Sequence, residues 1–350
     1  MSVTEEGQSA EGGVFPLEYD PNAPLLEVED LHVEFRTRDG IVKANSGISY
    51  TLREEETLAI VGESGSGKTV SAQAVMGIID TPPGYITQGA ARLRGVDMFE
   101  LPDPERRAMR GERIAMIFQD ALTALNPVFP VGWQIAETFR AHRGTSKREA
   151  RKHAIELLDR VRIPAAKERV NAYPHEFSGG MRQRAMIAMS LALDPEVLIA
   201  DEPTTALDVT VQAQIMNLLQ DLQGETKMGL ILITHDLAVI AEVADRALVM
   251  YAGKAVEHGS VKEIFRNPGH PYTLGLLQSI ARPEQKGGKL IPIVGSPPDL
   301  LHVPSGCPFH PRCRYRQDIC SEVEPPMTDT RPGRASACHF AEEVLALGKQ

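Results

Sequence analysis

The segment GESGSGKT, residues 62–69, constrains this chain more than any other stretch. It follows the apolar run TLAIV and precedes a segment that is typical of a helix. Glycines in such a loop let backbone N–H groups converge on phosphate oxygens at a helix N-terminus, while Lys68 neutralises the β- and γ-phosphates and Thr69 ligates Mg²⁺. A chance glycine turn would not be framed by a strand and a helix, so the sequence predicts an α/β fold that binds a nucleotide. The predicted phosphate-binding residues are Gly62, Glu63, Ser64, Gly65, Ser66, Gly67, Lys68 and Thr69.

A pair of acidic residues farther along the chain supports the same chemistry. Asp201 ends the apolar run VLIAD, where its carboxylate can hold Mg²⁺ directly or through a water molecule. Glu202 follows and can polarise the water that attacks a γ-phosphate. Taken alone, the pair could also be acidic residues that cap a helix. Together with the phosphate loop, it predicts a hydrolytic site.

Composition narrows the class of protein. The 350 residues are 42% hydrophobic and 24% charged, which is ordinary for a globular chain with two or three sub-structures. No apolar run reaches the ~18 residues that span a bilayer. Residues 1–30 hold eight acidic side chains and no Lys or Arg, unlike a secretory signal, and the net charge of −10 argues against a nucleic-acid surface. We therefore expect a cytosolic protein that has no nucleic-acid partner.

Changes of pattern divide the chain into parts. Residues 1–23 are polar, acidic and dotted with Gly and Pro, which predicts a disordered tail. Apolar runs then predict a parallel-sheet core with an antiparallel edge subdomain, and residues 120–180 predict a helical subdomain. Beyond residue 265, Pro and Gly become frequent. We expect a nucleotide-binding domain over 24–265 and a small Cys-rich C-terminal module over 266–350.

The stretch FSGGMRQR, residues 177–184, decides the family resemblance. Ser178 is a good N-cap, and Gly179 and Gly180 allow close approach of the backbone, so the stretch predicts a second exposed helix N-terminus. By itself it could be an ordinary capped helix. Its place shortly before LIADEP resembles the signature of ABC-type ATPases, with Met181 where Gln is commoner. The resemblance covers residues 25–265 and implies a P-loop ABC-ATPase fold that binds ATP and Mg²⁺.

The resemblance also implies roles for single residues. Gln119 in IFQD is similar to the glutamine that senses Mg²⁺ and water and contacts the transport partner, and His235 in ITHD is similar to the switch histidine at the γ-phosphate. The segment ALD, which ends in Asp208, is similar to the loop that crosses the dimer interface. Phe35 lies near the aromatic position that stacks on adenine, where Tyr is commoner. The implied catalytic residues are Glu202, His235 and Gln119, the Mg²⁺ ligands are Thr69, Gln119 and Asp201, and the signature residues that act on ATP held by a partner are Ser178, Gly179 and Gly180.

The C-terminal part makes the resemblance more specific. The stretches NPGHPYTLGLLQSI, PIVGSPPDLLHVPSGCPFHPRC and ACHF resemble the C-terminal region of ATPase subunits from oligopeptide and dipeptide importers, a group that includes nickel-type systems. This implies an ATP-hydrolysing subunit at the cytoplasmic face of the cell membrane that powers peptide uptake. Its implied partners are a second ATPase subunit, commonly a paralogue, two transmembrane permeases and, through them, an external solute-binding protein.

Other functions stay open at this point. An importer of nickel or another small solute would share the tail, and an exporter would share only the ATPase motifs. A DNA-repair or chromosome-type ABC ATPase would carry a long heptad-repeat coiled coil between phosphate loop and signature, but here prolines break that gap. A ribosome-associated factor would usually have two cassettes, and this chain has one phosphate loop.

Four cysteines are gathered near the C-terminus, and the first 306 residues contain none. Their spacing, C-x5-C-x6-C-x17-C, matches neither zinc-ribbon knuckles nor the bacterial ferredoxin run, so it does not choose a metal. Four thiols in proline-framed loops fit a cubane, His310 and His339 allow zinc, and two disulfides are the alternative that a cytosolic chain disfavours. The importer resemblance implies a [4Fe–4S] cluster with a mainly structural role. The predicted ligands are Cys307, Cys313, Cys320 and Cys338.

Overall fold

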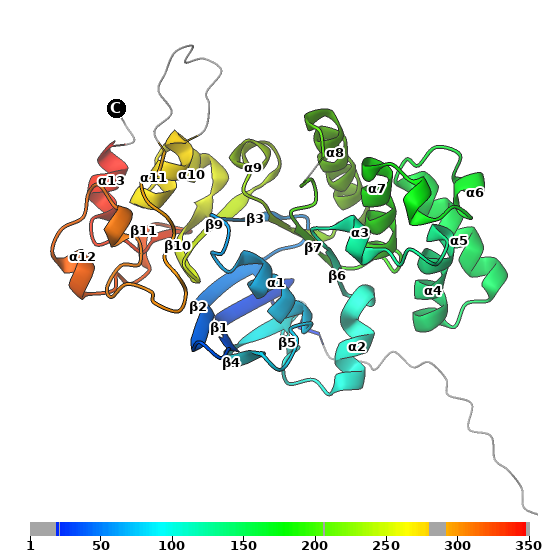
Figure 1. Cartoon of the computed structure of the whole chain (residues 1–350), viewed down its shortest axis with the longest axis horizontal. Coiled ribbons are helices and arrows are strands. Elements are labelled where there is room, and N and C mark those ends of the chain that lie inside the picture. Colours follow the sequence, from blue (N-terminus) through cyan, green and yellow to red (C-terminus); the bar gives the residue numbers. More distant parts are fainter. Residues whose placement is uncertain (1–18, 21, 206, 280–291, 348–350) are drawn as a thin grey trace, which may run out of the picture.

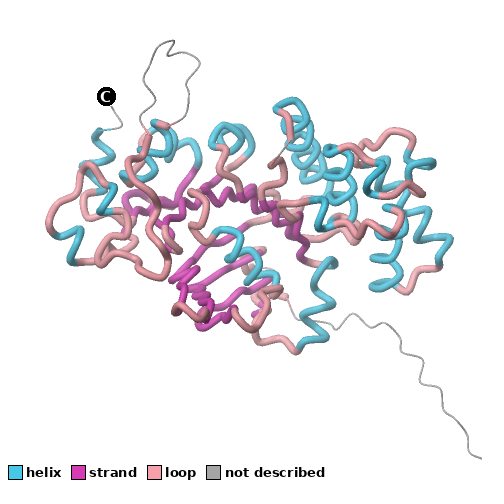
Figure 2. Tube along the Cα trace, viewed as in Figure 1, coloured by secondary structure: helices cyan, strands magenta, loops and turns pink. Residues whose placement is uncertain are grey.

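The computed structural model describes residues 19, 20, 22–205, 207–279 and 292–347, and they form two sheets with helices around them. Figure 2 shows the larger sheet running across the middle of the molecule, with the smaller sheet below it in this view. Most of the predicted acidic tail, 1–18 and 21, lies outside the described residues. The tail's last residues contact the domain, because the Asp20 N–H donates to the carbonyl oxygen of Arg94 at 3.0 Å.

The larger sheet is parallel where the sequence predicts a parallel core. Neighbouring pairs β9–β3, β3–β8, β8–β7 and β7–β6 all run parallel, and all residues of β3, β8, β7 and β6 are buried. Strands that are covered on both faces read as continuous apolar runs, as these do. Their carboxyl ends therefore meet at one edge of the sheet. In order across the sheet the strands are β11 (Thr328–Arg331), β12 (Arg334–Ser336), β10 (Lys254–Ser260), β9 (Arg246–Tyr251), β3 (Thr57–Val61), β8 (Gly229–Ile233), β7 (Val197–Asp201) and β6 (Ile114–Ile117).

The smaller sheet is the predicted antiparallel part. Leu26 and Leu31 of this sheet and Leu58 of the larger sheet share one buried cluster with Ala72 and Val75 of α1 (Lys68–Met76), so α1 links the two sheets. Figure 1 shows α1 lying where the sheets approach each other. The order is β2 (Ile41–Leu52), β1 (Leu26–Arg36), β4 (Gly84–Leu93) and β5 (Val96–Asp97), with antiparallel neighbours throughout.

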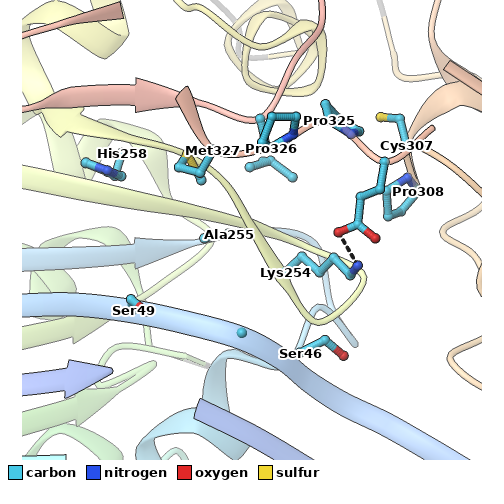
Figure 3. Close-up of a pocket in the computed structure, with 14 residues that line it drawn as sticks. Ser46, Ser49, Lys254, Ala255, His258, Cys307, Pro308, Pro325, Pro326 and Met327 are labelled. Carbon is cyan, nitrogen blue, oxygen red and sulfur yellow. Dashed lines mark hydrogen bonds and ion pairs between the residues drawn. The ribbon is translucent and has the colours of Figure 1, made fainter. Parts of the chain in front are cut away.

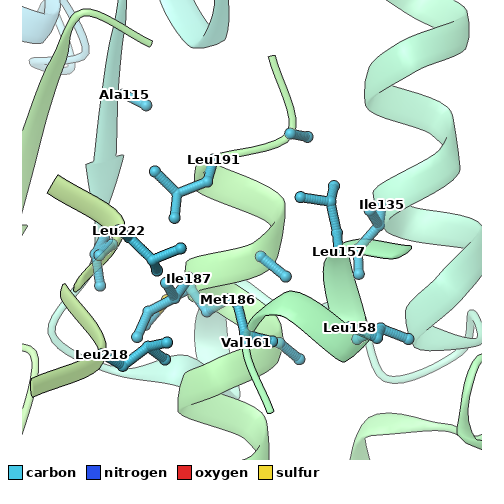
Figure 4. Packing of buried hydrophobic residues seen from close by; sticks show 14 of the residues in the cluster. Ala115, Ile135, Leu157, Leu158, Val161, Met186, Ile187, Leu191, Leu218 and Leu222 are labelled. Carbon is cyan, nitrogen blue, oxygen red and sulfur yellow. The ribbon is translucent and has the colours of Figure 1, made fainter. Parts of the chain in front are cut away.

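Residues 120–180, which the sequence predicts to be a helical subdomain, are mostly helical, and α7 (Gly179–Ser190) begins at their end. Met186 and Ile187 of α7 are fully buried between Leu158 of α5 and Leu218 of α8 (Figure 4). Each such buried aliphatic side chain stabilises the fold by about 1.5–3 kcal/mol. This packing fixes the N-terminal end of α7 relative to α8. Within the predicted bounds lie α3 (Ala121–Ala124), α4 (Val131–Arg143), α5 (Lys147–Arg160), α6 (Ala166–Arg169) and the 3-10 turn Pro174–Glu176, while α2 (Asp103–Glu112) and α8 (Val209–Thr226) lie outside them.

The C-terminal segments are built onto the larger sheet. Strand β12 pairs with β10, and the two strands are joined by a buried ion pair between Arg334 and Glu257, whose side chains are 1% and 0% exposed. Tyr272 and Phe309 share a core with Val61 of β3. The C-terminal elements are α9 (Leu237–Val243), α10 (Val261–Arg266), α11 (Pro271–Gln278), the 3-10 turn His310–Arg312, α12 (Ile319–Glu322) and α13 (Ala341–Leu347). In the part of the chain described here, no helix is both long and apolar enough to cross a bilayer.

Candidate active site

The phosphate loop runs from the end of β3 to the start of α1, as the sequence predicts. Two of its glycines cannot carry a side chain. A Cβ at Gly62 would lie 2.2 Å from the carbonyl oxygen of Met250, and one at Gly67 would lie 2.3 Å from that of Ala44. Gly67 also has a φ of +96°, a conformation that glycine adopts without strain. The loop is therefore pressed against β9 and β2, and its backbone forms a fixed cradle.

Lys68 is folded back onto this cradle. Its Nζ donates to the carbonyl oxygens of Gly62 and Glu63 at 2.8 and 3.0 Å, and its side chain is buried. Burial lowers the pKa of Lys68, and the carboxylates of Glu202 and Asp201 oppose that change. The ammonium group thus lies inside the loop, where a phosphate group can replace the carbonyl oxygens as its partner.

Thr69 and Asp201 meet although they come from different elements. The Thr69 Oγ1 hydroxyl donates to Asp201 Oδ1 at 3.1 Å, and Asp201 is the last residue of β7. Burial raises the pKa of Asp201, and the neighbouring Glu202 raises it further, while the Thr69 hydrogen bond and Lys68 oppose them. A hydroxyl and a carboxylate side by side next to a phosphate loop are oxygen donors of the kind that Mg²⁺ prefers. The residues present therefore suit this ion.

The Glu202 carboxylate contacts three side chains, those of the predicted site residues Gln119 and His235 and that of Thr205. It accepts from Gln119 Nε2 at 3.1 Å and from Thr205 Oγ1 at 2.8 Å, and its Oε1 lies 3.2 Å from His235 Nδ1. Burial acts to raise the pKa of Glu202, but the hydrogen bonds with Thr205 and His235 outweigh it, so the pKa is lowered. The group is ionised at neutral pH and can accept a proton or a hydrogen bond from water.

The backbone of Glu202 is strained. Its φ is +44°, in the left-handed region that residues other than glycine seldom adopt. The N–H of Glu202 donates to the carbonyl oxygen of Ile233 at 2.8 Å, which ties the residue to the end of β8. Strain of about 1–3 kcal/mol at a single residue persists where the surroundings fix it, and such residues cluster at functional sites. Here it turns the carboxylate toward Gln119 and His235.

The signature residues lie on a different part of the chain. Ser178 caps α7 by accepting from the Met181 N–H at 3.3 Å, and Asp208 caps α8 by accepting from the Val211 N–H at 3.0 Å. A Cβ at Gly180 would lie 2.8 Å from Val211, so the starts of α7 and α8 are packed together. Among the residues that the structure describes, no hydrogen bond joins this pair of helix starts to the phosphate loop. Ala206, the first residue of the predicted ALD loop, lies outside the described residues.

Phe35 lies in β1, partly buried against the cluster that joins the two sheets. Its predicted contact with adenine stays a prediction.

Three further residues contact the loop, and none of them was predicted to be a site residue. Asn45 Nδ2 donates to the Gly67 carbonyl oxygen at 3.1 Å, and the Glu63 N–H donates to the hydroxyl of Tyr272 at 2.8 Å. Arg312 forms an ion pair with the Glu63 carboxylate. No local motif marks Asn45. Tyr272 and Arg312 lie in C-terminal stretches that carry the importer resemblance, but nothing local shows that either residue reaches the loop through the fold.

A cavity of about 350 Å³ lies beside the loop rather than in it. Figure 3 shows it between β2, β10 and the C-terminal segment, with the ion pair between Lys254 and Glu324 at one side. Cys307 is the one predicted site residue in its lining. The phosphate-binding groups instead lie on the loop itself, so we take the loop as the candidate site.

The prediction of a [4Fe–4S] cluster is wrong. Within the described residues, which include all four cysteines, no group of three or more His, Cys, Asp or Glu side chains could hold a metal ion, so zinc has no support either. The cysteines line one pocket of about 20 Å³ and are free thiols, which also excludes the disulfide alternative. Burial raises the pKa of Cys313 to about 11 and that of Cys338 to about 12. Burial among apolar groups therefore keeps these two groups as thiols at neutral pH.

Comparison with known proteins decides the family. The ABC transporter profile matches residues 45–205, and the profile of the oligopeptide/dipeptide transporter C-terminal region matches residues 256–320. The oligopeptide transport ATP-binding protein OppD of Salmonella typhimurium is 51% identical over 325 residues, which are 93% of this chain and 96% of that protein. The chain belongs to this family of ABC importer ATP-binding subunits. The dipeptide transport ATP-binding protein DppD of Bacillus subtilis is also 51% identical, over 91% of this chain and 95% of that one.

Solved structures agree with the fold of the family. A dimeric structure of a bacterial ABC transporter cassette has a TM-score of 0.60 and 26% identity, and it covers 67% of this chain and 98% of that one. The same values describe a dimeric cassette in a post-hydrolysis state with ADP and phosphate. The chain therefore has the P-loop ABC-ATPase fold, with mixed α/β sheets, and is an ATPase of the ABC type.

Proposed function

We propose that this chain hydrolyses ATP to power the uptake of di- or oligopeptides. The observation that carries the hydrolysis is the meeting of Lys68, the Thr69–Asp201 pair and Glu202 at one sheet edge. The peptide cargo is supported by relatives named oligopeptide and dipeptide transport ATP-binding proteins, which match this chain over more than nine tenths of its length. Transport of nickel is the alternative, and no observation in the structure favours it.

In the proposed mechanism, Lys68 turns its donors from the loop carbonyls to the β- and γ-phosphates. Thr69, Asp201 and Gln119 would hold Mg²⁺, and the ion would supply positive charge next to the phosphates. Glu202 orients the attacking water and takes its proton, while His235 hydrogen-bonds to Glu202 and faces the γ-phosphate.

Closure of the site is proposed to need a second ATPase subunit, which we expect to be a paralogue. Ser178, Gly179 and Gly180 start a helix whose exposed N–H groups and dipole suit a γ-phosphate. These residues pack against the start of α8 and not against the chain's own phosphate loop. This placement suits an arrangement in which they complete the binding site for ATP held by the partner, with Asp208 at the interface. ATP would then hold the two subunits together until it is hydrolysed.

The assembly is proposed to include two permeases and, outside the membrane, a solute-binding protein, with this chain at the cytoplasmic face. Residues 24–265 would form the ATPase domain and residues 266–350 a C-terminal module. Phe35 would stack on adenine.

Reconstitution tests the function. The chain, its permeases, the second ATPase and the solute-binding protein are placed in proteoliposomes, and ATP hydrolysis and uptake of a labelled tripeptide are measured together. We expect uptake that requires ATP and is lost in Glu202→Gln. Uptake of nickel ions in place of the peptide would overturn the cargo, and hydrolysis that is coupled to neither solute would overturn the transport function.

A further inference from the structure

Arg312, in the C-terminal 3-10 turn, contacts the phosphate loop through its guanidinium group. Nη1 and Nη2 donate to the two oxygens of the Glu63 carboxylate at 2.6 and 3.0 Å. Nε and Nη2 also donate to the carbonyl oxygens of Val294 and Gly295, both at 3.1 Å, and Nη1 donates to the Tyr251 hydroxyl at 3.3 Å. The side chain is only 6% exposed. Every donor direction of the guanidinium group is thus used, in a geometry that Lys cannot reproduce.

Glu63, the second residue of the loop, is fixed from three sides. Its carboxylate is bound by Arg312, its N–H donates to the Tyr272 hydroxyl at 2.8 Å, and its carbonyl oxygen accepts from Lys68 Nζ at 3.0 Å. Both Tyr272 and Arg312 come from beyond residue 265. The phosphate loop therefore takes part of its shape from the C-terminal segments rather than from the ATPase motifs alone.

The charge of Glu63 would oppose nucleotide binding if it were unpaired. The carboxylate is attached to the loop that receives the phosphates, and Glu63 lies close enough to Lys68 to act on its pKa. Like charges a few ångströms apart repel, most strongly where water is partly excluded. The bidentate ion pair cancels this repulsion before ATP arrives.

We propose that Arg312 is a positioning residue for ATP, which masks the charge of Glu63 and holds the start of the phosphate loop in the shape that binds phosphate. The inference rests on the proposed function, because it concerns the same nucleotide. It makes the C-terminal segment around His310–Arg312 a part of the ATP site, acting through Glu63.

The test compares ATP affinity in four full-length proteins: wild type, Arg312→Gln, Glu63→Gln and the double variant. Titration calorimetry with Mg²⁺ and ATP gives each Kd. We expect Arg312→Gln to raise the Kd about tenfold, which corresponds to about 1.4 kcal/mol. The double variant should return to within about threefold of the wild type, because the unmasked carboxylate is gone. The increase in Arg312→Gln should shrink as salt is added.

Arg316→Gln is the matched control, because Arg316 lies four residues after Arg312, beyond the 3-10 turn, and is exposed. It should leave the Kd unchanged. In the assembled transporter, Arg312→Gln should raise the KM for ATP with little change in kcat, and Arg312→Lys should lie between wild type and Arg312→Gln.

Two results would overturn the inference. One is an unchanged Kd in Arg312→Gln. The other is a double variant that binds ATP as weakly as Arg312→Gln, since a purely structural role predicts no rescue. If Arg312→Gln does not fold, Arg312→Lys and Glu63→Gln carry the same comparison, and an unchanged Kd in Arg312→Lys would count against the inference. Failure of the wild type to bind ATP would instead overturn the proposed function.

Discussion

The Thr69 hydroxyl donates to the Asp201 carboxylate at 3.1 Å, although the two residues are 132 positions apart. Thr69 lies in the first turn of α1, which follows β3, and Asp201 ends β7, with β8 between those strands in the sheet. Parallel strands end at one edge, so the loop that follows β3 and the carboxylate that ends β7 face the same space. This pairing of a hydroxyl with a carboxylate next to a phosphate loop is the geometric basis of the proposed hydrolysis.

Glu202→Gln should stop turnover while ATP still binds. The amide keeps the size of the side chain and can accept hydrogen bonds from Gln119 and Thr205, but it cannot take a proton from water. We expect the ATPase rate of the assembled transporter to fall by about 100-fold or more, with the closed ATP-bound pair accumulating. Glu242→Gln, at an exposed site on α9, is the control and should hydrolyse ATP normally. Normal ATPase rates in Glu202→Gln would contradict the assignment.

Lys68→Ala should act earlier, on nucleotide affinity as well as rate. The ammonium group is buried inside the loop, and its loss removes the positive charge at the β- and γ-phosphates in both the ground state and the transition state. A Kd for ATP raised by about tenfold or more is expected in calorimetry. Lys262→Ala, at an exposed site on α10, provides the comparison. Unchanged affinity in Lys68→Ala would mean that Lys68 does not contact the phosphates.

Ser178→Arg should leave ATP binding to the isolated chain intact and block hydrolysis in the assembled pair. The new side chain would fill the space in front of α7, where the partner's γ-phosphate is proposed to lie. The substitution also removes an N-cap worth about 1 kcal/mol. Ser146→Arg controls for that loss, because Ser146 caps α5 in the same way, by accepting from the Glu149 N–H at 3.3 Å. Loss of ATP binding by the isolated Ser178→Arg chain, or normal hydrolysis by its pair, would count against the proposed geometry.

The residues at the carboxyl edge of the parallel sheet could be predicted from the sequence, because the signals that mark them are local. A continuous apolar strand that ends in Asp201, and another that precedes His235, require only that parallel strands share an edge. The contact between Arg312 and Glu63 joins residues 249 positions apart and depends on how the C-terminal segments return across the sheet. Strand β12 has three residues and gives no periodic signal. The metal prediction was wrong because cysteine spacing and resemblance do not fix the arrangement of the thiols.

The buried pair between Glu257 and Arg334 should contribute much of the free energy that holds the C-terminal strands to the larger sheet. Arg334 Nη2 donates to Glu257 Oε1 at 2.9 Å, and the Glu257 carboxylate also accepts from the N–H groups of Gly269 and His270. Glu257→Gln would leave the guanidinium group of Arg334 buried without its counter-charge. Breaking a buried pair in this way typically costs about 3–5 kcal/mol. Urea unfolding should show a loss of that size, and the double variant Glu257→Gln, Arg334→Met should lose less than the sum of the single changes.

The pair of Arg162 and Asp221 provides the comparison that decides this prediction. Arg162 Nη2 lies 2.6 Å from Asp221 Oδ2, but the two side chains are 57% and 54% exposed. Water screens such a pair, so Asp221→Asn should cost about 0–1 kcal/mol. The two substitutions remove the same charge from an acidic side chain that pairs with arginine, and burial is the main difference between them. If Glu257→Gln costs no more than Asp221→Asn in the same urea titration, the Glu257–Arg334 pair does not hold the C-terminal strands to the sheet.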